Sequence, residues 1–267
     1  MRLIYFLTIA SCLVAGCGKD PYSAEQKYWH LNNNARRILH APQSTPAMEW
    51  KKNIAALETF IRHYPASPEA FPAQLLVIKM YTEQMKFTEA REHIQSLMKT
   101  HPDSEKILSE ATFLLGQSYE KEGKGAEAVQ YYQQIRAQYR DSLRAFLIPL
   151  YIAGYYQKTH QDDKATDAYR EAADYYLQHS EKFDGTNTGF NALLMATQCY
   201  RALLDWKNAA NTLERTAEKY AGKQRVEPLL IQAAYIYAYQ LKDTKKAEKV
   251  IERVKTINPA VNIPRNE

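Results

Sequence analysis

The side chains that could carry out catalysis are scattered in this sequence rather than clustered. No His-Glu-x-x-His or Cys-x-x-Cys motif occurs, and no glycine-rich phosphate-binding loop follows a predicted strand. The segment from His160 to Asp163 has the composition of a metal site, but it lies where a turn between two helices is expected. Asp162 or Asp163 is better interpreted there as a helix N-cap, which the helix dipole favours. We therefore predict no catalytic residue, no bound metal, no cofactor and no enzymatic activity.

One cysteine near the N-terminus is predicted to be modified. Arg2, an apolar run over residues 3–14 and small residues before Cys17 have the layout of a secretory signal peptide, and the run is too short to span a bilayer as a helix. Small residues followed at once by cysteine resemble a bacterial lipobox. The pattern predicts a lipoprotein signal peptide over residues 1–16, lipidation of Cys17, and a lipidated tether over residues 17–22.

Two other interpretations of this segment are open. Cys12 is a weaker lipidation site, because cleavage before it would leave a very short apolar run, and an ordinary signal peptide with an incidental cysteine is the second alternative. Gly18 follows Cys17, whereas Asp at that place in lipoproteins resembles an inner-membrane retention mark. We therefore expect the protein to be lipid-anchored in the outer membrane and to face the periplasm.

The charge balance argues against a nucleic-acid partner. The 35 Lys and Arg residues only slightly outnumber the 30 Asp and Glu residues, and the two signs alternate along the chain instead of forming a basic stripe. The small excess suits an acidic patch on a protein partner. Cys199 is the one cysteine beyond the N-terminal segment, so no internal disulfide is expected, and burial in the core explains this residue best.

The elements that must position any site are helical repeats. The segment from Ala111 to Tyr139 shows one complete helix-turn-helix unit, in which Gly116 and Ala128 allow two helices to cross closely. Further copies align on a small residue that opens each second helix, with steps of 38, 37, 44 and 38 residues: Ala90, Ala128, Ala165, Ala209 and Ala247. The first helices carry an aromatic residue nine positions earlier, at Tyr81, Tyr119, Tyr156 and Tyr200, with Ala238 in the last copy. This is the tetratricopeptide (TPR) pattern, with a period slightly longer than the usual ~34 residues.

The predicted fold is an all-α, right-handed TPR solenoid of five to six helix-turn-helix repeats. It covers residues 23–257, begins with Ser23 as a helix cap, and is followed by a disordered tail over residues 258–267. The 44-residue step predicts an exposed loop from Ser180 to Thr188 around an Asp-Gly turn. No linker divides the repeats, so one continuous solenoid is expected.

A concave groove lined by the first helices is the expected binding surface. The repeat alignment predicts a polar groove with a few apolar anchors, which suits an extended or helical peptide. Solvated helix faces are the alternative interpretation for any single residue. The partner-binding residues predicted for the groove are Lys79, Thr82, Phe113, Gln117, Glu120, Lys121, Gln157, Lys158, Asn191, Gln198, Arg201, Gln232 and Tyr239.

A lipobox followed by TPRs with Tyr-Pro-Ala-Ser-Pro-type turns resembles the BamD family, the TPR lipoproteins of the outer-membrane β-barrel assembly machinery. The segments FIRHYPASPEAFPAQ and AEKVIERV carry the likeness, and the architecture is similar from Ser23 to Pro259. The resemblance implies a non-catalytic scaffold that binds protein partners in the cell envelope, among them a β-barrel assembly subunit. It also implies substrate contacts on one side, at Phe60, Tyr64, Phe71 and Gln74, and docking contacts on the other, at Arg225, Gln232 and Tyr239.

Two other kinds of envelope protein have similar features. The periplasmic coordinator protein of the Tol-Pal system has similar turns, and the TPR pilotin lipoproteins of type IV pili have a similar lipobox and repeat count. The alternative function is therefore that of a pilotin or cell-envelope coordination lipoprotein, which binds a secretin or a peptidoglycan synthase.

Overall fold

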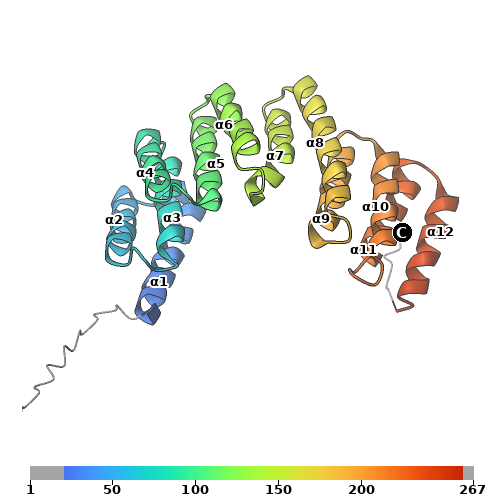
Figure 1. Cartoon of the computed structure of the whole chain (residues 1–267), viewed down its shortest axis with the longest axis horizontal. Helices are drawn as coiled ribbons and strands as arrows, with labels where there is room; N and C mark the ends of the chain where they lie inside the picture. The colour runs from blue at the N-terminus through green and yellow to red at the C-terminus, as the bar shows by residue number, and fades with distance from the viewer. Residues whose placement is uncertain (1–20, 261–267) are drawn as a thin grey trace, which may run out of the picture. The chain divides into compact units, whose positions relative to one another are not determined.

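The computed structural model describes residues 21–260, and the all-α TPR class predicted from the sequence is confirmed. Within these residues the chain forms twelve α-helices, a 3-10 turn (Pro42–Ser44) and a π-helical segment (Ile236–Gln240), joined by short turns (Figure 1). The α-helices are α1 (Pro21–His40), α2 (Ala47–His63), α3 (Ala70–Glu83), α4 (Phe87–Thr100), α5 (Glu105–Lys121), α6 (Gly125–Gln138), α7 (Leu143–Lys158), α8 (Asp162–Lys182), α9 (Asn187–Ala202), α10 (Trp206–Tyr220), α11 (Glu227–Tyr235) and α12 (Thr244–Ile257). Cys17, the signal peptide and most of the predicted tail lie outside the described residues.

The helix pairs from α3/α4 to α11/α12 are joined by turns of one kind. The residue five positions before each repeat alanine has a positive φ, between 56° and 84°: Met85, Gly123, His160, Leu204 and Lys242. In the first four pairs the backbone N–H of the residue that follows the positive-φ residue donates to the carbonyl of the repeat tyrosine, at 2.8–3.0 Å. This is the Schellman arrangement that ends many helices. Its recurrence at the repeat period confirms the alignment made from the sequence.

Small residues allow the two helices of a pair to approach closely. The five repeat alanines are at most 7% exposed. At Gly116 an added Cβ would lie 2.3 Å from Cε1 of Tyr132, so the obstacle is the tyrosine ring of α6. Tyr132 is fully buried, and its ring centroid lies 5.6 Å from that of Phe113 and 5.0 Å from that of Tyr151. Glycine at position 116 is therefore a packing requirement of this pair.

The described residues cluster into two compact units. The first comprises residues 21–103 together with 117–125. Helices α1, α2 and α3 pack on one another around an apolar core, and α4 packs on α3. The fully or nearly fully buried side chains of this core include Ile38, Trp50, Leu57, Phe60, Val77 and Met80.

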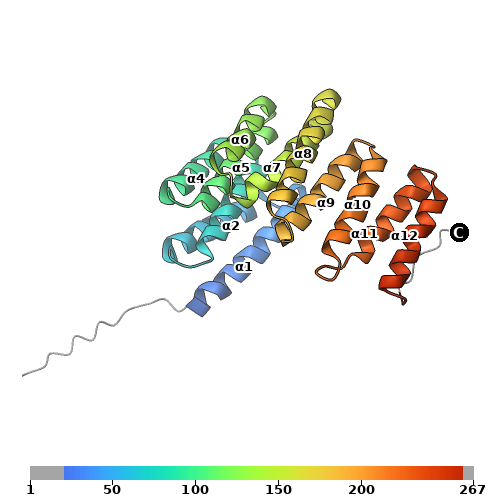
Figure 2. The same ribbon diagram turned by 45° about the vertical axis from the view of Figure 1, so that its right-hand side comes forward.

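The second unit comprises residues 104–116 together with 126–260. Helices α7 to α12 pack against one another in chain order, and Figure 2 shows α9, α10, α11 and α12 side by side. One apolar cluster joins α7, α8 and α9 around Tyr176 and Cys199, and another joins α9 to α12 around Leu213 and Tyr220. The buried position predicted for Cys199 is confirmed.

The loop predicted from Ser180 to Thr188 is too long, although its exposed Asp184-Gly185 turn is present, with a φ of 70° at Gly185. Helix α8 continues to Lys182 and α9 begins at Asn187, so only residues 183–186 separate them. Ser180 is buried, and its hydroxyl donates to the carbonyl of Leu177 at 2.7 Å. Because this turn of helix is packed and hydrogen-bonded, the extra residues of the 44-residue step lengthen α8 instead of forming a loop.

Two predicted N-caps are also wrong. Helix α1 begins at Pro21, so Ser23 lies within its first turns. The N-cap of α8 is Gln161, whose side chain makes no capping hydrogen bond. Asp162 and Asp163 occupy the first turn of α8 instead, where the helix dipole still favours a carboxylate.

Candidate partner-binding surfaces

Most of the predicted groove residues are accessible. Gln117 and Glu120 are half-buried. The exposed members are Lys79, Lys121, Gln157, Lys158, Asn191, Gln198, Arg201, Gln232 and Tyr239. Lys121 is held in place, because its Nζ atom donates to Oε1 of Glu83 at 2.6 Å.

Two predicted groove residues are corrected, because they belong to the core. Thr82 is 8% exposed, and its hydroxyl donates to the carbonyl of Ile78 at 2.9 Å within α3. Phe113 is 5% exposed and packs with Tyr132 and Tyr151. The guanidinium carbon of Arg144 lies 4.0 Å from the centroid of the Phe113 ring. Neither side chain is available to a partner in a groove.

Three predicted groove residues meet in one depression of the second unit, here called the C-terminal cleft. It has a volume of 410 Å³, and α9, α10, α11 and the π-helical segment supply its walls. Its lining residues are Arg201, Trp206, Gln232, Tyr235, Ile236, Tyr239 and Gln240. Gln157, Lys158, Asn191 and Gln198 do not line it. The cleft therefore combines aromatic rings, side-chain amides and one guanidinium.

The π-helical segment shapes the C-terminal cleft. The last repeat lacks the aromatic residue at Ala238, and here the N–H of Asp243 donates to the carbonyl of Tyr237, six residues back instead of five. The wider turn follows the point where α11 ends at Tyr235 and the π-helical segment begins. The rings of Tyr235 and Tyr239 stack with centroids 5.6 Å apart, and Tyr239 is 47% exposed.

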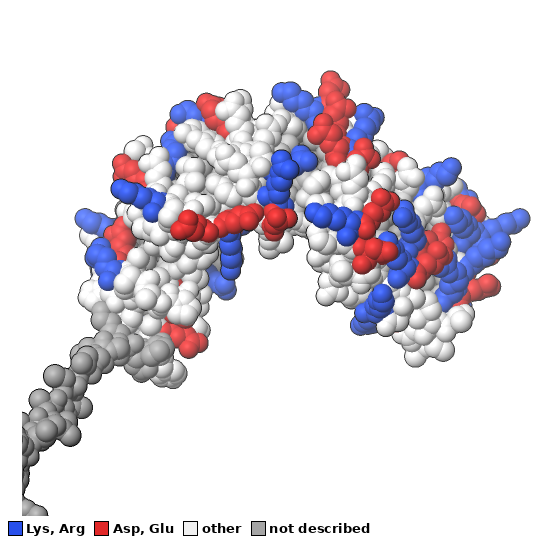
Figure 3. Space-filling view, viewed as in Figure 1, with Lys and Arg blue, Asp and Glu red and all other residues white. Residues whose placement is uncertain are grey.

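Charged side chains around Tyr237 hold the π-helical segment in place. The hydroxyl of buried Tyr237 donates to Oε1 of Glu214 at 2.7 Å, and burial raises the pKa of Tyr237. Arg253 donates to the other carboxylate oxygen of Glu214 at 2.6 Å, and Nζ of Lys246 lies 4.2 Å from the Tyr237 ring centroid. On the face shown in Figure 3, acidic and basic side chains are interspersed over the C-terminal helices. Local pairing thus neutralises much of the charge around Glu214.

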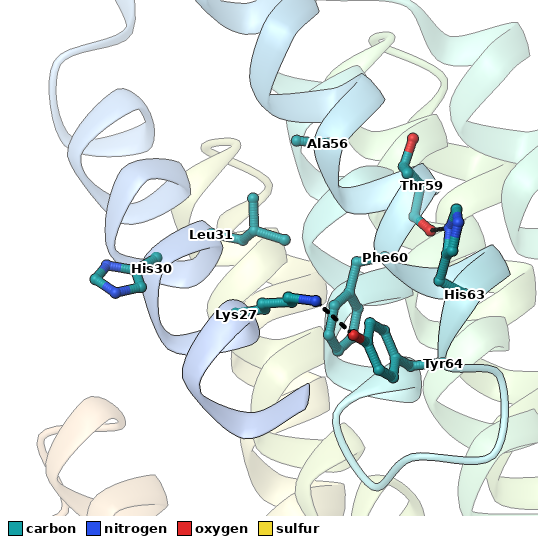
Figure 4. Close-up of a pocket in the computed structure, with 8 residues that line it drawn as sticks. All are labelled: Lys27, His30, Leu31, Ala56, Thr59, Phe60, His63 and Tyr64. Carbon is teal, nitrogen blue, oxygen red and sulfur yellow. Dashed lines mark hydrogen bonds between the residues drawn. The ribbon is translucent and has the colours of Figure 1, made fainter. Parts of the chain in front are cut away.

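A second depression, here called the N-terminal pocket, lies between α1 and α2 of the first unit (Figure 4). It has a volume of 470 Å³ and is lined by Lys27, His30, Leu31, Ala56, Thr59, Phe60, His63 and Tyr64. Lys27 donates from Nζ to the hydroxyl oxygen of Tyr64 at 2.6 Å, as Figure 4 shows. The rings of Phe60 and Tyr64 stack with centroids 5.1 Å apart. The pocket is a mainly apolar recess with a lysine at its edge.

The resemblance-based substrate residues are only partly gathered there. Phe60 and Tyr64 line the N-terminal pocket, whereas Phe71 and Gln74 lie on α3 and do not. Oε1 of Gln74 is buried without a hydrogen-bond partner among the described residues. The sequence interpretation missed Lys27 and His30, because α1 precedes the repeats from which the groove was derived.

The described residues offer no sign of a metal or membrane-spanning site. Residues 21–260 contain no group of three or more His, Cys, Asp or Glu residues that could hold a metal ion. His160, from the segment with the composition of a metal site, lies at an exposed turn. In the same residues no helix is both long and apolar enough to cross a bilayer.

The fold and these surfaces define a TPR protein. Residues 39–148 match the YfiO family model, described as an outer membrane lipoprotein, and residues 191–222 match a tetratricopeptide repeat model. The two matches support a TPR outer-membrane lipoprotein that takes part in protein–protein interaction. None of the curated proteins matches the chain.

Several solved structures are similar to this chain at low identity. BtubC from P. vanneervenii is 15% identical, with a TM-score of 0.46 over 92% of this chain and 94% of that chain. TPR-like repeats of a putative kinesin light chain from Podosopora anserina are 17% identical, with a TM-score of 0.45 over 72% and 96%. PilW, a type IV pilus biogenesis factor, is 14% identical, with a TM-score of 0.43 over 90% and 96%.

Proposed function

We propose that this protein is a non-catalytic scaffold lipoprotein, anchored through Cys17 at the inner face of the outer membrane, that binds protein partners in outer-membrane protein assembly. The observation that carries the proposal is the composition of the C-terminal cleft. Trp206, Tyr235, Tyr239 and Arg201 belong to the residue types that dominate binding energy at protein interfaces. The match of residues 39–148 to an outer membrane lipoprotein family supports the cellular setting.

The chemistry of the cleft favours a protein partner over a small substrate. Stacked Tyr235 and Tyr239 offer a rigid apolar surface, while Gln232, Gln240 and Arg201 offer donors and acceptors at its edge. An apolar centre with a polar rim is the usual anatomy of a protein interface. In this role the cleft docks a periplasmic domain of a β-barrel assembly subunit.

The N-terminal pocket has a separate role in the proposal. Phe60 and Tyr64 form an aromatic floor that accepts an apolar side chain of an extended substrate segment, and Lys27 at the edge pairs with a carboxylate or a main-chain carbonyl. The two surfaces thereby bind two different proteins, a transported substrate and a fixed subunit of the assembly machinery.

Site-specific photo-crosslinking in living cells tests the docking surface. A photoreactive phenylalanine analogue at Tyr239 should crosslink to a β-barrel assembly subunit, because that side chain is exposed in the cleft. The same analogue at Lys249, an exposed position of α12 outside the cleft, is the matched control and should give far less of that product. Equal crosslinking from both positions, or none from position 239, would remove the cleft as the docking surface. A secretin or a peptidoglycan synthase as the product would favour the pilotin or coordination function.

Membrane fractionation tests the anchor. Cys17→Ala should release the protein into the soluble periplasm, because no lipid can be attached, whereas Cys12→Ala should leave it with the outer membrane. A Cys17→Ala protein that stays membrane-bound would overturn lipid anchorage at this residue.

A further inference from the structure

A third depression, here called the basic cleft, lies on the second helices of two neighbouring repeats. It has a volume of 640 Å³ and is bordered by α6, α8 and the start of α7. Its lining residues are Gln133, Arg136, Ala137, Arg140, Asp141, Ala145, Tyr175, His179 and Lys182. It shares no residue with the C-terminal cleft or the N-terminal pocket, so its function does not depend on theirs.

The unusual length of α8 builds one wall of this cleft. Helix α8 has 21 residues, whereas the equivalent second helices α4, α6 and α12 have 14 and α10 has 15. Its last turns carry an aromatic row at four-residue spacing, Tyr175, His179 and Phe183. Successive ring centroids in this row lie 4.5 Å and 5.3 Å apart. The extension therefore adds His179 and Lys182 to the lining of the cleft, which a second helix of 14 residues would not reach.

Three cations line the basic cleft without a carboxylate partner among the described residues. Arg136, Arg140 and Lys182 make no ion pair among the described residues, although Arg136 lies 5.3 Å from the Tyr175 ring centroid. Neighbouring Arg144 shows the contrast, because it binds both carboxylate oxygens of Glu110. Asp141 is the one acidic side chain that lines the cleft. The lining thus keeps an uncompensated positive charge.

We propose that the basic cleft binds an acidic peptide segment of a partner protein. Arg136, Arg140 and Lys182 pair with its Asp or Glu carboxylates, and an apolar side chain beside them packs on Tyr175. An anionic membrane surface fits less well, because lipid-binding clusters usually contain about four to eight basic residues, and here three line a recess. Charge-assisted hydrogen bonds from guanidinium groups to carboxylates give such a site both affinity and orientation.

Peptide binding to the full lipidated protein in non-ionic detergent tests the proposal. The probe is a fluorescein-labelled octapeptide of alternating Glu and Leu, and its Gln-Leu counterpart is the uncharged control; fluorescence anisotropy reports binding. Arg140→Gln with Lys182→Gln should weaken Glu-Leu binding about tenfold, since each change removes one charged contact. Both side chains are exposed, so the fold should tolerate the change. Lys207→Gln with Arg215→Gln removes the same charge from exposed positions outside the cleft and is the matched control.

The outcomes separate the proposal from its alternatives. Binding of the Glu-Leu peptide that is weakened only by the cleft variant, with little binding of the Gln-Leu peptide, supports it. Equal weakening by both variants, or no binding to the wild type, overturns it. Direct binding to micelles that contain phosphatidylglycerol gives a further readout: lipid binding that is lost in the cleft variant, with no peptide binding by the wild type, would assign the cleft to lipid and also overturn the proposal.

Discussion

Gly116 and Gly154 should respond in opposite directions to the same change, glycine to alanine. Both lie inside α-helices of the second unit, where alanine is intrinsically favoured over glycine by about 1 kcal/mol. At Gly154 the nearest atom to an added Cβ is the hydroxyl oxygen of Tyr169 at 4.0 Å, so the methyl group fits. At Gly116 the added Cβ would lie 2.3, 2.8 and 3.0 Å from three atoms of the Tyr132 ring.

The size of the difference follows from the surroundings of Tyr132. Its ring is fully buried and packed against Phe113 and Tyr151, so it has no free space into which to move. Overpacking of this kind costs about 1–3 kcal/mol. Gly154→Ala should therefore raise the free energy of unfolding by up to about 1 kcal/mol. Gly116→Ala should lower it by up to about 2 kcal/mol, after the helix-propensity gain is subtracted.

Urea unfolding followed by circular dichroism at 222 nm measures both effects. The slope must be compared as well as the midpoint, because repeat proteins can lose two-state cooperativity. Gly116→Ala combined with Tyr132→Leu is the control for the mechanism, since a smaller side chain should relieve part of the overlap. If Gly116→Ala were as stabilising as Gly154→Ala, the close approach of α5 and α6 at Tyr132 would be refuted.

Three further predictions concern single side chains of the second unit. Burial raises the pKa of the Cys199 thiol to about 12, so iodoacetamide at pH 8 should label it only after denaturation. Glu214→Gln should lower the free energy of unfolding by about 1–3 kcal/mol, because it weakens the acceptor of the Tyr237 hydroxyl. Glu218→Gln changes a side chain that is 65% exposed and is the control; it should change the free energy of unfolding in urea by less than about 0.5 kcal/mol. Burial lowers the pKa of His179, so the folded state binds fewer protons than the unfolded state below the ordinary histidine pKa. The contribution of neutral His179 to the free energy of unfolding should therefore be present at pH 7.5 and decrease towards pH 5. The urea midpoint of His179→Gln should fall less than that of the wild type over the same pH range.

The repeat architecture could be predicted because two local requirements recur at one period. The first is a small residue, such as Ala90 or Ala128, and the second is an aromatic residue nine positions earlier; both are visible in the sequence. The chain reversal five residues before each alanine falls on a glycine only at Gly123. The end of α8 could not be predicted in the same way. Ser180, Glu181 and Lys182 are polar, and only the packing of Ser180 in the folded protein shows that the helix continues.

The candidate sites were predicted in part for a similar reason. Repeat position correctly placed Arg201, Gln232 and Tyr239 on accessible surface, but it also selected Thr82 and Phe113, which local packing buries. The π-helical segment gives no sequence signal beyond the missing tyrosine. The basic cleft was missed because the interpretation considered only the first helices, whereas its residues lie on second helices.

Purification of the lipidated protein from its own membranes in mild detergent, followed by mass spectrometry, tests the scaffold function most directly. We expect a β-barrel assembly subunit with periplasmic repeat domains to co-purify in near-equal amount. The amount of this subunit should fall when Tyr239 and Arg201 in the C-terminal cleft are both changed to Ser, and should be unaffected by Lys249→Ser. Purification of the intact lipoprotein without any envelope protein bound would contradict the account.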